Sequence, residues 1–156
     1  MSGTAIAVVY SSEGFAIAAD GREMRDAEVN TDDRQKIFAI EPEETLAYAL
    51  AGSAIITHTT ATTQYNLEAD VARAVQQAIS GDALTFGGYL DNVRSVVYEG
   101  LRAAKESGTV DTYPNLDGQG TIATLIIAGY YKGQAVDAAV QITHKDQCLR
   151  LPFPIP

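Results

Sequence analysis

The sequence predicts a mixed fold of antiparallel strands and helices, in which sheets stack on each other and helices cover them from outside. Strand patterns come first, two amphipathic helix patterns follow, and strand patterns then return. Most strand segments are apolar on both alternating faces, as strands covered on both sides are. Layered sheets with outer helices accommodate this order of elements.

The first part of the chain predicts four consecutive strands. The polar turn Ser11-Ser12-Glu13-Gly14 joins the first two as an antiparallel hairpin. Residues 22–35 are charged and aperiodic, and Glu41-Pro42-Glu43-Glu44 forms the turn between the third and fourth strands. Joined in order, the strands predict a meander. They span residues 4–10, 15–19, 36–40 and 45–51.

Two helices follow, each with one apolar stripe. Asn66 is placed to cap the start of the first helix, and the second helix is expected to end near Ser107-Gly108. The threonine-rich residues 59–63 fit either an extension of the first helix or a loop. The two stripes consist of Leu67, Val71, Ala74, Val75, Ala78 and Ile79, and of Leu90, Val93, Val96, Val97, Leu101 and Ala104.

The last part of the chain predicts strands again. Residues 108–120 are rich in Gly, Asp, Asn and Pro and indicate a loop. Strands are predicted at 121–130 and 134–143, joined through Lys132-Gly133, and a short one at 147–151. The prolines of the tail cannot donate backbone hydrogen bonds, so the tail should end the sheet.

Size and charge limit the function. A chain of 156 residues with 46% hydrophobic residues is expected to form one domain. The net charge of -9 opposes binding to nucleic acid, and no apolar run is long enough to cross a membrane. A cytoplasmic location is the default expectation. The single cysteine, Cys148, lies in an apolar stretch and is assigned a packing role.

Three polar residues follow one another at equal intervals of the sequence. Thr4 begins the first predicted strand, Asp20 follows the second and Lys36 begins the third, so a meander places all three at one edge. A threonine hydroxyl needs a base, and a free α-amine with a pKa of roughly 8 is matched to neutral pH. A lysine ammonium would favour the alkoxide, and an aspartate would hold that lysine charged and aimed. The residue types suit a nucleophilic hydrolase.

Four segments carry a family resemblance: Gly3-Thr4, Ala18-Ala19-Asp20-Gly21-Arg22, Lys36-Ile37-Phe38 and Ala51-Gly52-Ser53-Ala54. In order and spacing they resemble the opening half of proteasome β subunits and their bacterial ring-protease relatives, which are N-terminal-nucleophile (Ntn) hydrolases. The resemblance implies an αββα sandwich of two antiparallel sheets. The chain ends where the family continues, so one outer helical layer is expected to be missing.

The resemblance also implies residue roles. Thr4 matches the nucleophile, Asp20 and Lys36 its partners, and Gly52 the oxyanion-hole donor. Gly3 matches the residue before the self-cleavage point, which makes residues 1–3 a leader and residues 4–156 a single domain that is incomplete at its C-terminus. By position the substrate pocket would include Glu23, Met24, Arg34, Phe38, Leu50 and Ala54, although core packing is the alternative role for the last three.

The function expected from this resemblance is a threonine peptidase that forms an acyl-enzyme on Thr4 after autocatalytic removal of Met1 to Gly3. Peptides or unfolded proteins would be its substrates, copies would assemble into a ring, and an ATP-dependent unfoldase would be a partner. No metal or organic cofactor is implied, and neither His58 nor His144 has metal-ligand spacing. Alternatives are a non-catalytic ring subunit, an amidohydrolase of small amides, and a fragment completed elsewhere.

Overall fold

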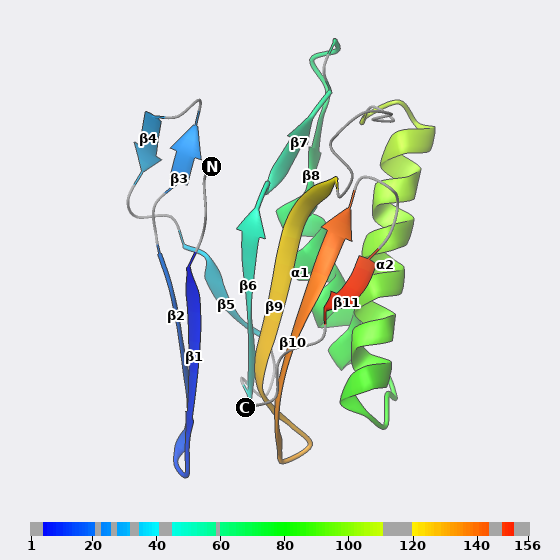
Figure 1. Ribbon diagram of the computed structural model, residues 1–156. Helices are drawn as coiled ribbons and strands as arrows, with labels where there is room; N and C mark the ends of the chain where they lie inside the picture. Colours follow the sequence, from blue (N-terminus) through cyan, green and yellow to red (C-terminus); the bar gives the residue numbers. More distant parts are fainter. Residues whose placement is uncertain are drawn as a thin grey trace.

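The computed structural model of this chain describes residues 5–20, 23–25, 28–31, 35–40, 45–58, 60–110, 120–143 and 148–151, with the backbone alone described at 23–25, 28–31 and 148–151. Within these residues the fold is mixed α+β, built from two helices and antiparallel sheets (Figure 1). Neither helix is long and apolar enough to span a membrane.

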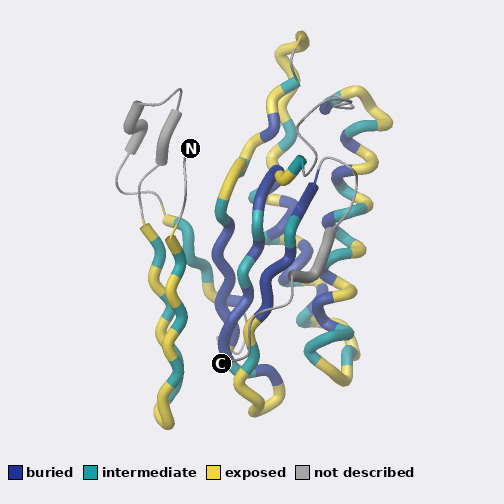
Figure 2. The backbone as a smooth tube through the Cα atoms, viewed as in Figure 1, coloured by how far each residue is buried: buried dark blue, intermediate teal, exposed yellow. Residues whose placement is uncertain are grey.

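A five-stranded antiparallel sheet forms the centre of the fold, in the order β11-β10-β9-β6-β5. Its central strands are long, apolar and largely buried (Figure 2). Lys132 and Gly133 both have positive φ, at 51° and 79°, which is the geometry of a two-residue hairpin turn, so the predicted connection is confirmed. The strands are β5 (Ile37–Ile40), β6 (Leu46–Gly52), β9 (Thr121–Tyr131), β10 (Gln134–Thr143) and β11 (Cys148–Leu151).

Both predicted helices are confirmed. Helix α1 (Leu67–Ile79) is capped by Asn66, whose side-chain oxygen accepts from the Ala69 amide at 2.9 Å. Helix α2 (Phe86–Glu106) begins after Thr85 and ends at the predicted place. Their apolar stripes form one core with the side chains of β6, β9 and β10 that point towards them.

The two faces of the large sheet have different neighbours. Successive residues of a strand point to opposite faces, and on β9 the ring of Tyr131 lies 5.5 Å from that of Tyr89 in α2. The adjacent Tyr130 instead contacts the hairpin of β1 (Ile6–Ser11) and β2 (Gly14–Ala19). Helices and hairpin therefore lie on opposite sides of the sheet (Figure 1).

Side-chain size also differs between the faces. Leu50, Tyr48 and Ile127 point towards the helices, whereas the cross-strand register of β5, β6, β9 and β10 places small residues on the other face. These include Ala39, Ala47, Ala49, Ala128 and Ala139. Small side chains leave room for a second layer to approach closely.

The predicted four-strand meander is wrong. Strands β1 and β2 form a separate two-stranded sheet, and β5 and β6 belong to the large sheet. Alternate residues of the hairpin are partly buried and exposed (Figure 2), so one apolar face packs inward and the other, including Val9, faces outward. Apolar alternation indicates that a strand is covered, but it does not identify the neighbouring strand.

Two short hairpins escape the sequence analysis. Strands β3 (Glu23–Arg25) and β4 (Glu28–Thr31) pair within the stretch taken as aperiodic. Strands β7 (Ile55–Thr57) and β8 (Gln64–Asn66) pair on either side of the threonine-rich segment, whose described residues 60–63 belong to the loop of this hairpin, so the loop alternative is confirmed there. Ribbons of three or four residues are too short to show a clear period.

Candidate functional site

The strand ends that carry the predicted residues lie at one end of the molecule. In Figure 1 the start of β1, the end of β2, the start of β5 and the end of β6 all point towards the upper part of the view. Strand β2 also contacts β5, although the two belong to different sheets. The structure therefore brings these segments to a common end by stacking two sheets, instead of by a meander.

Asp20 lies beside the start of β1. Its backbone N–H donates to the carbonyl of Ala5 at 3.1 Å, which extends the hairpin pairing one residue beyond Ile6 and Ala19. Asp20 is exposed. Thr4, the residue before Ala5, and Gly3 lie outside the described residues, so their predicted roles stay predictions.

Lys36 immediately precedes β5 and is partly buried. Its neighbour Gln35 donates through its side-chain amide to the carbonyl of Ile37 at 3.1 Å, which bridges the backbone at the entry to the strand. Because β5 contacts β2, Asp20 and Lys36 belong to adjoining elements.

The amide of Gly52 has a defined direction. Ser53 N–H donates to Ile122 O at 3.0 Å and Tyr130 N–H donates to Thr45 O at 2.7 Å, so odd-numbered residues of this segment direct their backbone groups towards β9. Successive residues of an antiparallel strand alternate in this direction. We infer that the Gly52 N–H points away from β9, to the side of the sheet on which β5 lies.

Gly52 is also fixed as a glycine by its surroundings. Its φ is +105°, and an added Cβ would lie 2.6 Å from Ile122 O and 2.9 Å from the Ala123 Cα. Both contacts are with backbone, which cannot move aside as a side chain can. A residue with a side chain would therefore shift the end of β6 and redirect its amide.

Three of the six predicted pocket residues, Phe38, Leu50 and Ala54, have described side chains. Leu50 is a buried member of the core and Phe38 packs against that core, stacked on Tyr48 at 5.1 Å, in agreement with their alternative packing role. Ala54 is partly buried, and its carbonyl accepts from the Glu68 amide at 3.1 Å. Glu23 and Met24 form part of β3, of which only the backbone is described, and Arg34 lies outside the described residues.

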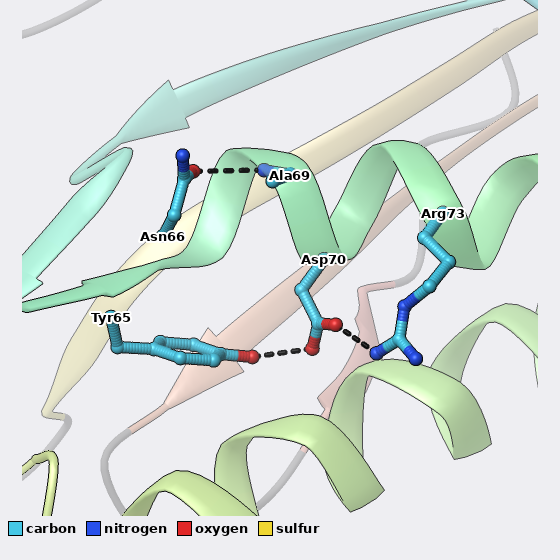
Figure 3. Close-up of polar contacts among 5 residues, drawn as sticks. All are labelled: Tyr65, Asn66, Ala69, Asp70 and Arg73. Carbon is cyan, nitrogen blue, oxygen red and sulfur yellow. Dashed lines mark hydrogen bonds and ion pairs between the residues drawn. The ribbon is translucent and has the colours of Figure 1, made fainter.

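A polar cluster that sequence analysis missed lies between β8 and the helices. Asp70 of α1 is only 9% exposed, and its carboxylate accepts from the Tyr65 hydroxyl and pairs with Arg73 (Figure 3). Gly100 of α2 faces the same carboxylate, and a Cβ there would overlap it. The only signal in the sequence is an aspartate beside an otherwise apolar helix stripe.

This cluster is satisfied internally. Both carboxylate oxygens of Asp70 have a protein partner, one from Tyr65 and the other from Arg73. Pairing of both oxygens offsets the cost of burying the carboxylate, so the contacts within the protein account for this cluster. Within the described residues no group of three or more His, Cys, Asp or Glu side chains is placed to hold a metal ion.

Two comparisons with known proteins identify no relative of this chain. A scan against models of protein families finds no match for the chain, and a search of curated proteins finds no matching sequence. A functional hypothesis therefore rests on the residues and on the arrangement of the strand ends that carry them.

Proposed function

We propose that this chain is an Ntn hydrolase of the proteasome type, a threonine peptidase whose nucleophile is Thr4 after removal of Met1 to Gly3. The observation that carries the proposal is the hydrogen bond from the Asp20 amide to Ala5, which holds the end of β2 beside the start of β1. The contact between β2 and β5 adds the segment that begins with Lys36. Nucleophile, carboxylate and ammonium would thus come from adjoining strand ends.

The proposed reaction has two stages. The Thr4 hydroxyl oxygen attacks the carbonyl carbon of a peptide bond while its proton passes to the Thr4 α-amine. The tetrahedral intermediate collapses, the C–N bond breaks, and the leaving amine takes that proton. Water, activated by the same α-amine, then hydrolyses the ester and restores the hydroxyl. No metal or organic cofactor takes part in these steps.

The surrounding residues have electrostatic roles in this proposal. The Lys36 ammonium would stabilise the alkoxide character of the attacking oxygen, and Asp20 would orient the ammonium. The Gly52 N–H, which we infer to be directed towards the β5 side, would donate to the oxyanion of the intermediate. One such donor contributes about 100-fold to 1,000-fold in rate.

The same attack explains leader removal. The Thr4 hydroxyl would attack the carbonyl of Gly3, transfer the leader from nitrogen to oxygen, and release it when water cleaves the resulting ester. Glycine places no side chain beside that carbonyl and leaves it open to approach. Release of the leader frees the α-amine that later turnovers need.

The fold and assembly proposals follow from the same assignment. Two stacked sheets with helices outside one of them are compatible with part of an αββα sandwich. We further propose that identical chains assemble into a ring. Its substrates would be peptides or unfolded proteins, which an ATP-dependent unfoldase would deliver. The outward apolar face of the β1–β2 hairpin is consistent with a further layer or a second copy covering it.

The first test reads the mass of the N-terminal peptide. The purified wild-type protein is expected to lose Met1, Ser2 and Gly3 together, whereas Thr4→Ala retains Ser2 and Gly3. Loss of Met1 alone is uninformative, because aminopeptidases remove an initiator methionine before serine. Loss of all three residues from Thr4→Ala would exclude self-processing.

The second test asks whether Thr4 is a nucleophile. The wild-type protein is incubated with a peptide epoxyketone, which reacts with an N-terminal threonine through both hydroxyl and amine, and the modified residue is identified by peptide mass spectrometry. Modification at Thr4 supports the proposal. A fully processed protein that shows no modification would contradict it and would favour a non-catalytic ring subunit.

A further inference from the structure

The hydroxyl of Tyr10 bridges two strands of the large sheet from the face opposite the helices. It donates to Val136 O at 2.5 Å and accepts from the Gly129 N–H at 3.2 Å. Gly129 of β9 and Val136 of β10 are cross-strand partners. A side chain of the N-terminal hairpin is therefore joined to the backbone ladder of the central sheet.

The site that receives Tyr10 is shaped for it. Gly129 has a φ of +136°, and a Cβ there would overlap the carbonyl of Thr45 and approach Phe15 Cε1 to 3.0 Å. The ring of Tyr10 lies 6.1 Å from those of Phe15 and Tyr130. The absence of a side chain at Gly129 thus leaves room for the aromatic residues of the hairpin.

These contacts differ in kind from the rest of the hairpin interface. The inward residues of β1 and β2 are apolar, and their packing is non-directional, so it resists separation of the layers but tolerates sliding. Strands β1 and β2 have no ladder partner in the large sheet. The two hydrogen bonds of Tyr10, aided by the one from Tyr130 to Ser11 O at 3.1 Å, define an axial position.

We propose that Tyr10 is a positioning residue, which fixes the axial position of β1 and thereby sets Thr4 and Asp20 against Lys36 and Gly52. This inference rests on the proposed function. Thr4 precedes Tyr10 by six positions in the sequence, and the hairpin pairing runs unbroken from Tyr10 back to Ile6. A shift of about 1 Å at Tyr10 would move the whole paired strand, and a misplacement of that size at a reacting group can cost about 100-fold in rate.

The state of the hydroxyl supports this role. Burial raises the pKa of Tyr10, and the nearby Asp137 and Tyr130 raise it further, whereas the bond from Gly129 lowers it. The net direction keeps the hydroxyl protonated at neutral pH. It can therefore donate to Val136 and accept from Gly129 at the same time.

The test compares Tyr10→Phe with Tyr131→Phe. The first variant keeps the ring and loses both ladder contacts; the second loses a hydroxyl on the opposite face of β9, which donates to Ala83 O at 2.8 Å. The rate constant and the binding constant for epoxyketone reaction at Thr4 are measured separately. Tyr10→Phe is expected to lower the rate constant at least about 10-fold with binding changed less than about 2-fold. Tyr131→Phe should leave both constants unchanged.

A second measurement does not depend on catalysis. A spin label is attached at Ala18→Cys in a Cys148→Ser background, and its broadening of the amide signals of β5 is compared with and without Tyr10→Phe. Altered broadening supports the inference even if Thr4 proves unreactive, in which case only the proposed function fails. Unchanged broadening, or an unchanged rate constant together with faster hydrogen exchange at the Gly129 amide, overturns it.

Discussion

The N–H of Asp20 donates to the carbonyl of Ala5, so the exposed aspartate lies beside Ala5. In the proposed enzyme, Ala5 is the second residue of the processed chain, directly after Thr4. Hairpin pairing fixes this relationship, since Ile6 and Ala19 are the adjacent partners. Activity should therefore depend on the carboxylate of Asp20, whereas folding should not.

Asp20→Asn is expected to slow epoxyketone modification of Thr4 by about 100-fold or more, because the orientation of Lys36 is lost. The free energy of unfolding should change by less than about 0.5 kcal/mol, since the side chain is exposed. Asp82→Asn, at another exposed aspartate, serves as the control. Equal rates for the two variants would remove Asp20 from the mechanism.

Gly52→Ala is expected to destabilise the protein by about 2 to 3 kcal/mol, because a positive φ and a collision with Ile122 O act together. Gly108→Ala is the matched control: its φ is +73°, and no atom lies within 4 Å of the added Cβ. It should cost only about 1 kcal/mol. Urea unfolding measures both, and equal losses would show that the backbone near Ile122 relaxes.

Gly100→Ala is expected to reverse the usual helix effect. Replacing a helix-interior glycine by alanine ordinarily stabilises by about 1 kcal/mol, but here the methyl group would displace the Asp70 carboxylate from Tyr65 and Arg73. We expect a net loss of about 2 to 4 kcal/mol. In an Asp70→Ala background the same change should be neutral or stabilising. A loss of the same size in both backgrounds would contradict the steric explanation.

Alkaline pH should weaken the fold through Tyr48. Burial raises the pKa of Tyr48 from 10.0 to about 12, and the charge of Glu68 contributes in the same direction. A raised folded-state pKa means that the stabilisation is complete below pH 10 and is lost as the pH rises through 12. Urea unfolding across this range should show a steeper decline for wild type than for Tyr48→Phe. Parallel declines would assign the effect to other groups.

Local patterns were sufficient to predict the helices and the last hairpin. The apolar stripe of α1 repeats at the helical period over several turns, and Asn66 caps the start of that helix. Lys132-Gly133 has the residues that a tight turn requires. These signals lie within a few residues of one another. The predicted meander placed Asp20 and Lys36 at one edge, and the end of β2 and the start of β5 do lie at one end of the fold (Figure 1), although the meander itself is wrong.

Local sequence patterns could not predict which distant strands pair with one another. Apolar strands 4–10 and 36–40 look alike in sequence, although one enters a separate hairpin and the other the edge of the large sheet. In the sequence, Tyr10 looks like any other residue of an apolar strand. Its hydrogen-bond partners, Gly129 and Val136, are more than 100 positions away. The same holds for Gly100, whose importance depends on Asp70 from another helix.

The bond between Tyr10 and Val136 joins residues 126 positions apart, which has a consequence for biosynthesis. A ribosome releases the N-terminal hairpin first, yet the ladder that seats it does not exist until β9 and β10 have emerged. During translation the first strands must wait undocked. If Thr4 is a nucleophile, this delay postpones its reaction, since the residue is not brought to its partners before the central sheet has been assembled.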